Sequence, residues 1–84
     1  MVTLTHTEAR RKSSMWSKGI INGYEYWVKH FDEGSEFGIN GGRISKLAIR
    51  DQQGRWLVNY DRGWDQRPTK EIKPIYDKLI EMYN

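Results

Sequence analysis

The sequence predicts an α+β fold, in which a small twisted antiparallel β-sheet of about three to five strands, connected as a meander, is packed by a C-terminal amphipathic α-helix. An Asn-Gly pair between apolar segments at 22–23 predicts a hairpin. Alternating apolar residues on both sides of a turn at 51–54 predict a second hairpin. Apolar residues at helical spacing over 72–83 predict the helix. The 84 residues include four Trp, five Tyr and two Phe but no Cys, so aromatic rings must fill the core without disulfides.

Residues 1–15 are expected to form a basic, flexible N-terminal arm, and residues 16–84 a single α+β domain. The first segment has little apolar content and no periodicity. Residues 1–19 carry Arg10, Arg11, Lys12 and Lys18 against Glu8, a net charge of +3, which equals that of the whole chain. The positive excess therefore lies in the arm and at the start of the domain.

The first predicted hairpin turns at Asn22-Gly23, because a type I′ turn needs positive φ at both central residues. Its second strand, 24–31, is aromatic and β-branched. Both faces of this strand are partly apolar, so alternation does not show which face is buried. The glycine-rich segment 37–42 then predicts a turn or bulge.

The second predicted hairpin joins strands 43–50 and 55–60. In the first of these strands Leu47 and Ile49 are expected to face inward beside Ser45. In the second, the alternation predicts that Trp56, Val58 and Tyr60 share one face.

The C-terminal helix follows a loop and is expected to be capped by Thr69. Pro74 must lie in or near its first turn, so the regular helix is expected to begin there. One face is apolar, and it consists of Ile72, Ile75, Tyr76, Leu79, Ile80 and Tyr83. The opposite face is charged and consists of Lys73, Asp77, Lys78 and Glu81.

The sequence favours a non-enzymatic protein without a cofactor or a metal site. His6 lies in the expected arm and His30 on a strand, whereas a catalytic triad or a metal site needs several such groups together. No apolar segment reaches membrane-spanning length, and the N-terminus lacks the apolar centre of a signal peptide. A cytoplasmic protein without a membrane partner is therefore expected.

The segment 60–65 is the most unusual, since it places Arg62 and Trp64 between Asp61 and Asp65. In one interpretation Trp64 covers the end of the core, and Arg62 pairs with Asp65 to hold the loop against the sheet. In the other, Arg62 and Trp64 are exposed anchors of an interface with a partner protein. The candidate partner-binding residues are Arg62, Trp64, Asp61, Asp65 and Arg43.

The basic arm suggests nucleic acid as an alternative partner. Its candidate phosphate contacts are Arg10, Arg11, Lys12 and Lys18. The candidate rings for stacking of nucleotide bases are those of Trp16, Tyr24, Tyr26 and Trp27.

The segments 35–47 and 60–65 resemble a family of short uncharacterised proteins from bacteriophages and mobile elements of Gram-positive bacteria. The resemblance runs from about Trp16 to Tyr83 and implies a small phage-type protein, without assigning any functional residue. We therefore expect a non-catalytic binding protein that inhibits a host defence complex, such as a CRISPR effector, in the host cytoplasm. Two alternatives stay open. One is a nucleic-acid or nucleotide-binding protein, and the other is a structural or oligomeric phage component, including a homodimer.

Overall fold

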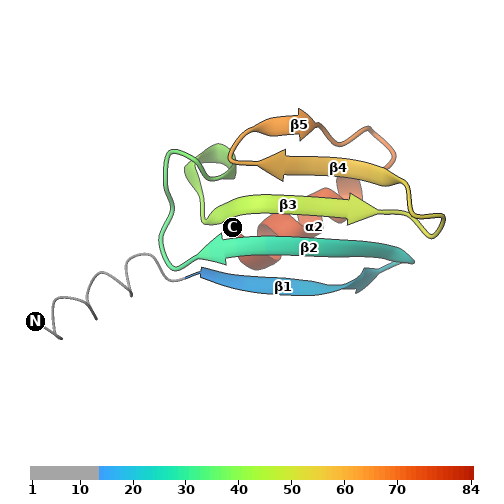
Figure 1. Ribbon diagram of the computed structural model, residues 1–84, viewed down its shortest axis with the longest axis horizontal. Coiled ribbons are helices and arrows are strands. Elements are labelled where there is room, and N and C mark those ends of the chain that lie inside the picture. Colours follow the sequence, from blue (N-terminus) through green and yellow to red (C-terminus); the bar gives the residue numbers. More distant parts are fainter. Residues whose placement is uncertain (1–13) are drawn as a thin grey trace, which may run out of the picture.

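The structure is a computed structural model that describes residues 14–84. The expected arm, with Arg10, Arg11 and Lys12, lies outside the described residues, apart from Ser14 and Met15, which belong to the first strand. A five-stranded sheet has the order β1-β2-β3-β4-β5 with every neighbouring pair antiparallel, and one helix follows it, so the predicted α+β meander is confirmed (Figure 1). The elements are β1 (Ser14–Ile21), β2 (Tyr24–Phe31), the 3₁₀ turn η1 (Ile39–Gly41), β3 (Ile44–Arg50), β4 (Trp56–Asp61), β5 (Trp64–Gln66) and α2 (Lys73–Tyr83).

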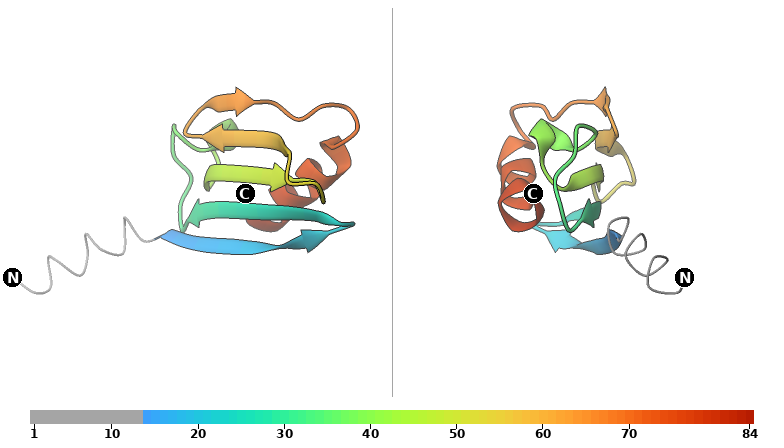
Figure 2. Two further views of the ribbon diagram at one scale, coloured as in Figure 1. Left: turned by 45° about the vertical axis from the view of Figure 1, so that its right-hand side comes forward. Right: turned by 90° about the vertical axis from the view of Figure 1, so that its left-hand side faces the viewer.

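Helix α2 packs against one face of the sheet and builds the core with it (Figure 2). The helix contributes Ile75, Tyr76 and Leu79 from the predicted apolar face, while its charged face is exposed. The buried residues of the core are Tyr26, Val28, Ile39, Ile44, Leu47, Ile49, Val58, Tyr60, Ile72, Ile75, Tyr76 and Leu79. No helix in the described part of the chain is long and apolar enough to cross a membrane.

The β1–β2 turn confirms the predicted hairpin. Asn22 and Gly23 both have positive φ, 52° and 85°, and Ile21 pairs with Tyr24 across the two-residue turn. This geometry is that of a type I′ turn, whose twist suits a hairpin.

Strand β2 buries the face that carries Tyr26 and Val28 and presents Trp27 and Lys29 on the other. Gly19 of β1 lies opposite Tyr26, and a Cβ atom at Gly19 would lie 2.8 Å from the Tyr26 hydroxyl. The absent side chain leaves room for the Tyr26 ring, whose hydroxyl lies 3.2 Å from that of Tyr83 at the end of α2. This packing determines which face of the strand 24–31 is buried, a question that the alternation of its residues left open.

The expectation for Trp56 is wrong. Leu47, Ile49, Val58 and Tyr60 are buried as predicted, but Trp56 lies on the opposite face, 45% exposed. The register between β3 and β4 shifts between Ile49 and Arg50, so that Arg50 pairs with Trp56 and Ile49 with Val58. A β-bulge places one extra residue in a strand, and the residues on its two sides then no longer alternate regularly.

The start of α2 is confirmed in part. The helix begins at Lys73 with Pro74 in its first turn, where the missing N–H of proline is tolerated. The Thr69 side chain does not cap it. Instead the Thr69 carbonyl accepts hydrogen bonds from the N–H groups of Ile72 and Lys73, which form a separate turn before the helix.

Candidate binding surface on the uncovered face of the sheet

The face of the sheet opposite α2 has no helix or loop over it within residues 14–84 (Figures 1 and 2). We call it the uncovered face. Its side chains form rows across the strands, because residues paired in register point to the same side of a sheet. One row is Trp16, Lys29, Lys46 and Asp61; the next is Lys18, Trp27, Ala48, Asn59 and Gln66; a third is Ile20, Glu25, Arg50 and Trp56.

A guanidinium group on this face lies against two tryptophans that also contact each other. The Arg50 guanidinium lies 5.1 Å from the centroid of the Trp27 ring and 5.3 Å from that of Trp56. The two ring centroids are 5.4 Å apart, and Glu25 fixes Arg50 through a 2.7 Å ion pair. Cation–π attraction and the ion pair hold these flat groups in one arrangement.

A second group of aromatic and basic side chains lies toward β1. The Lys29 ammonium lies 6.0 Å from the Trp16 ring centroid and 5.8 Å from that of Phe31. Trp16 is 56% exposed, which is high for so large an apolar ring. The uncovered face therefore combines exposed rings with cations that lie against them.

A shallow hollow of about 280 Å³ opens between these groups. Ala48 contributes the smallest side chain of its lining, while Trp16, Trp27 and Trp56 provide rings. Lys46, Asn59 and Asp61 add polar groups to the lining. A flat apolar ligand with polar edges fits this combination, since rings offer it stacking area and the polar groups fix its orientation.

The charges of the uncovered face are mostly positive. Arg50 pairs with Glu25, and Lys46 lies 3.8 Å from Asp61. Lys18 lies exposed at the edge strand, and Lys29 contacts rings and stands directly opposite Lys46. The three rows thus contain four cations and two carboxylates, and this net positive charge favours an anionic partner.

The segment 60–65, predicted as a possible interface, has some side chains on the surface and others packed against the core. Arg62 projects from the β4–β5 turn with 70% of its side chain exposed, and its nearest carboxylate is Asp61 at 3.9 Å rather than the expected Asp65. Trp64 is half-buried, edge-on to Tyr60 at 5.0 Å and tilted against Tyr76 at 5.7 Å. The Arg67 guanidinium lies 5.2 Å from the Trp64 ring centroid. Arg62 is accessible, whereas Trp64 extends the core.

The other residues predicted from the sequence are scattered. Asp61 faces the uncovered side, Asp65 is exposed on β5, and Arg43 is exposed before β3. Lys18 is the one predicted phosphate contact among the described residues, and it lies on the uncovered face beside Trp27. Of the predicted stacking rings, Trp16 and Trp27 lie on this face, while Tyr24 and Tyr26 lie on the other.

Trp56, Ala48 and Arg50 were missed as site residues. The sequence signal that could have found Arg50 and Ala48 is their alternation with Leu47 and Ile49, which were expected to face inward. For Trp56 no such signal exists, because its position depends on the bulge.

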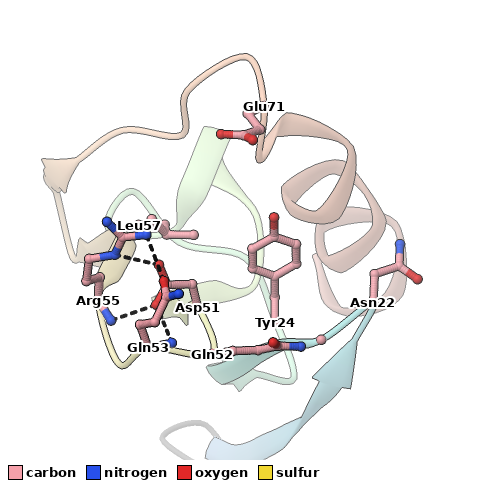
Figure 3. Close-up of a pocket in the computed structure, with 9 residues that line it drawn as sticks. Asn22, Tyr24, Asp51, Gln52, Gln53, Arg55, Leu57 and Glu71 are labelled. Atoms are coloured by element: carbon pink, nitrogen blue, oxygen red, sulfur yellow. Dashed lines mark hydrogen bonds and ion pairs between the residues drawn. The ribbon is translucent and has the colours of Figure 1, made fainter.

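A second cavity, of about 360 Å³, lies between the β1–β2 turn, the β3–β4 turn and the segment before α2 (Figure 3). Asp51 in its wall accepts hydrogen bonds from the N–H groups of Gln53 and Arg55 and pairs with the Arg55 guanidinium at 2.8 Å. The bond from the Arg55 backbone, more than any other interaction, lowers the pKa of Asp51 below its usual value. The carboxylate thus closes the turn.

His30 lies on the core side of β2. Its Nε2 is 3.1 Å from the Ser17 hydroxyl, and its ring stacks on Tyr83 with centroids 5.0 Å apart. Partial burial lowers the pKa of His30, Arg43 lowers it further, and Asp32 opposes the change. Among residues 14–84 there is no group of three His, Asp or Glu side chains placed to hold a metal ion.

Comparisons with known proteins add a family and one relative. A family model described as a domain of unknown function, DUF7678, matches residues 15–84. The thiol:disulfide interchange protein DsbE of Haemophilus influenzae is 29% identical over an alignment of 84 positions, which covers 96% of this chain and 45% of that protein. The chain therefore spans less than half the length of this relative. No solved structure matches the chain.

Proposed function

Since the chain belongs to the DUF7678 family, a domain of unknown function, we propose its function from its surface: non-catalytic binding of single-stranded nucleic acid on the uncovered face. The observation that carries this proposal is the interleaving of Trp16, Trp27 and Trp56 with cations on one open sheet face. This develops the nucleic-acid alternative suggested by the sequence, with the sheet as its main surface.

Exposed rings favour a single strand over a duplex. Bases in a duplex are stacked on one another, whereas those of a single strand offer their faces to aromatic side chains. Each base stacked on a ring contributes about 1–3 kcal/mol, without strong preference for sequence. We place one such base in the hollow of about 280 Å³ beside Ala48, whose lining includes three tryptophans.

The cations on this face support the same ligand. Lys18, Lys29 and Lys46 lie in adjacent rows, so a strand whose bases contact the rings brings its phosphates near ammonium groups. The basic sequence 10–12 precedes β1 in the amino-acid sequence and adds three cations to the protein. A surface of this kind binds with an affinity that depends strongly on salt.

The test is a titration of intrinsic tryptophan fluorescence with a single-stranded oligonucleotide of about 12 nucleotides, within the range of known strand-binding sites. We expect quenching, because three of the four Trp lie on the uncovered face, and weaker binding of a duplex of the same sequence. Absence of binding at low salt, or tighter binding of the duplex, would contradict the proposal.

A charge variant with a matched control tests the phosphate contacts. Lys29→Ala should reduce the slope of log affinity against log salt by about 0.7, the value for one single-strand phosphate contact. Lys78→Ala removes the same charge from the exposed face of α2 and should leave the slope unchanged. Equal slopes for both variants would show that Lys29 does not contact a phosphate group.

A second candidate function is the inhibition of a host defence complex by a phage-encoded protein, with Arg62 as a contact. The exposed Arg62 side chain favours it, because arginine is frequent among residues that dominate protein interfaces. The chain would then act in the host cytoplasm. Expression in a host with an active CRISPR effector should restore phage infection, and Arg62→Asn, which suits the positive φ of 58° there, should abolish this effect. Unchanged defence on expression contradicts this candidate.

A homodimer through the edge strand β1, where Met15 and Ile20 are 62% and 68% exposed, predicts a concentration-dependent sedimentation coefficient. Thiol–disulfide interchange, the activity in the name of the Haemophilus relative, is not proposed, because these 84 residues contain no cysteine.

A further inference from the structure

A larger hollow, of about 810 Å³, adjoins the uncovered face at the end of β2. It lies between the loop that follows β2 and the β4–β5 turn, and Lys29, Lys46 and Arg62 all line it. The Phe31 and Phe37 rings line the same space, and Phe37 is 54% exposed. Glu33 is the one carboxylate in its lining.

Two lysines that line this hollow lie opposite one another on neighbouring strands. Lys29 and Lys46 are direct cross-strand partners in the β2–β3 register, and like charges in that position destabilise a sheet. The Lys29 ammonium lies near the Trp16 and Phe31 rings, whereas the Lys46 ammonium lies near Asp61. The two ammonium groups thus have separate partners, and an anion between them would attract both.

Arg62 supplies the third cation from another element. Its side chain is 70% exposed and lies 3.9 Å from Asp61, so most of its donors are available to a ligand. A guanidinium donates paired hydrogen bonds to phosphate oxygens in a geometry that lysine cannot provide. Cations from β2, β3 and the β4–β5 turn therefore line one hollow beside two phenyl rings, and the Asp61 carboxylate lies 3.8 Å from Lys46 and 3.9 Å from Arg62.

We propose that this hollow holds a terminal phosphate monoester of the bound single strand, with the terminal base against Phe31 or Phe37. The inference rests on the proposed function. A monoester carries a charge of about −1.5 to −2 near neutral pH, more than the single charge of a phosphodiester inside the strand. A cluster of three cations attracts the more highly charged group more strongly, which allows the end of a strand to be distinguished from its interior.

The experiment compares one oligonucleotide in three forms, with a 5′-phosphate, with a 3′-phosphate and with hydroxyl groups at both ends. Calorimetric titration should show that one phosphorylated form binds about tenfold more tightly than the hydroxyl form, as expected for new charge-assisted hydrogen bonds. Which form is preferred identifies the end that enters the hollow.

Variants separate the hollow from the remaining surface. Arg62→Asn should remove most of the preference for the phosphorylated end and leave the affinity for the hydroxyl form within about twofold, because Arg62 lies outside the rows of the uncovered face. Lys70→Gln removes a cation from the turn before α2 and should preserve the preference. Unchanged melting temperatures would show that both variants fold.

The outcomes distinguish the two proposals. Equal affinity for all three forms, with the hydroxyl form still bound, overturns the terminal site and leaves strand binding intact. Failure to bind any of the three forms overturns strand binding and, with it, the terminal site. A preference that survives in Arg62→Asn also overturns the proposed site, because the phosphate must then bind elsewhere.

Discussion

Trp27 of β2 and Trp56 of β4 come within 5.4 Å of one another, measured between ring centroids, across the intervening strand β3. Strands separated by one neighbour lie about 9–10 Å apart, so the two rings must lean together over β3. Ala48, the β3 residue paired with Trp27, leaves room for this approach, because its side chain is a single methyl group. The same small residue leaves the hollow that we assign to a base.

Filling this hollow tests its role in binding. Ala48→Leu should lower the affinity for a single-stranded oligonucleotide about five- to hundredfold, since loss of one stacked base costs about 1–3 kcal/mol. The free energy of unfolding should fall by no more than about 0.5–1.5 kcal/mol, the contribution of one aromatic pair, because the larger side chain would separate the Trp27 and Trp56 rings. Fluorescence titration and urea denaturation give the two quantities. Ala48→Ser has nearly the same volume and should bind normally, and normal binding by Ala48→Leu would show that no base enters there.

A glycine pair tests the packing of Tyr26. Gly19→Ala should destabilise the protein by about 1–3 kcal/mol, the usual cost of overpacking, because the new Cβ would lie 2.8 Å from the Tyr26 hydroxyl. Alanine is otherwise a better strand residue than glycine, so the substitution destabilises the protein only because of this contact. Gly63→Ala, where nothing lies within 4 Å of the new Cβ, is the control. If urea denaturation shows Gly19→Ala to be as stable as Gly63→Ala, the Tyr26 ring moves freely.

Asn84 connects the end of α2 to the loop before β3. Its Oδ1 accepts the Ile44 N–H at 2.9 Å, and its Nδ2 donates to the Ile39 carbonyl at 3.0 Å. Asn84→Ala leaves the Ile44 N–H without a partner next to fully buried side chains, whereas the Ile39 carbonyl keeps its hydrogen bond from the Gly42 N–H at 2.8 Å, and the change should cost about 1–3 kcal/mol. Asn84→Asp keeps the acceptor for Ile44 and should lose less. Chemical denaturation of both variants checks this order, and a smaller loss for Asn84→Ala would contradict it.

The lowered pKa of His30 predicts a weak dependence of stability on pH. Its pKa in the folded protein is lowered from the ordinary 6.5, first by burial and then by Arg43. The unfolded chain therefore binds the proton more readily, so stability is fully present above about pH 6.5 and falls as the pH drops through the interval between the two pKa values. In thermal denaturation at about pH 7.5 and about pH 5.5, His30→Gln should show a smaller difference in melting temperature than the parent protein. An equal difference would assign the effect to other groups.

The local features of the fold could be predicted from the sequence. Asn22-Gly23 allows positive φ at adjacent residues, and the spacing of Ile72, Ile75 and Leu79 places them on one helical face, whatever lies around them. Pro74 limits where the regular helix can begin. Such signals depend on a few neighbouring residues, and all three are confirmed.

The candidate site could be predicted only in fragments. Lys18, Trp16 and Trp27 were singled out for nucleic acid from composition, but Tyr24 and Tyr26 were grouped with them and lie on the core side. In 24–31 both faces carry rings, so the alternation of the residues does not indicate which face is buried.

By itself, the sequence determined the order and kind of the elements, because turn dihedrals and apolar periodicity are properties of short segments. Only the tertiary structure decided which rings face outward. Gly19 admits Tyr26 to the covered side, and the bulge near Arg50 turns Trp56 to the uncovered one. Both effects arise from contacts between strands, and the free energy of such contacts depends on residues that are distant in the chain.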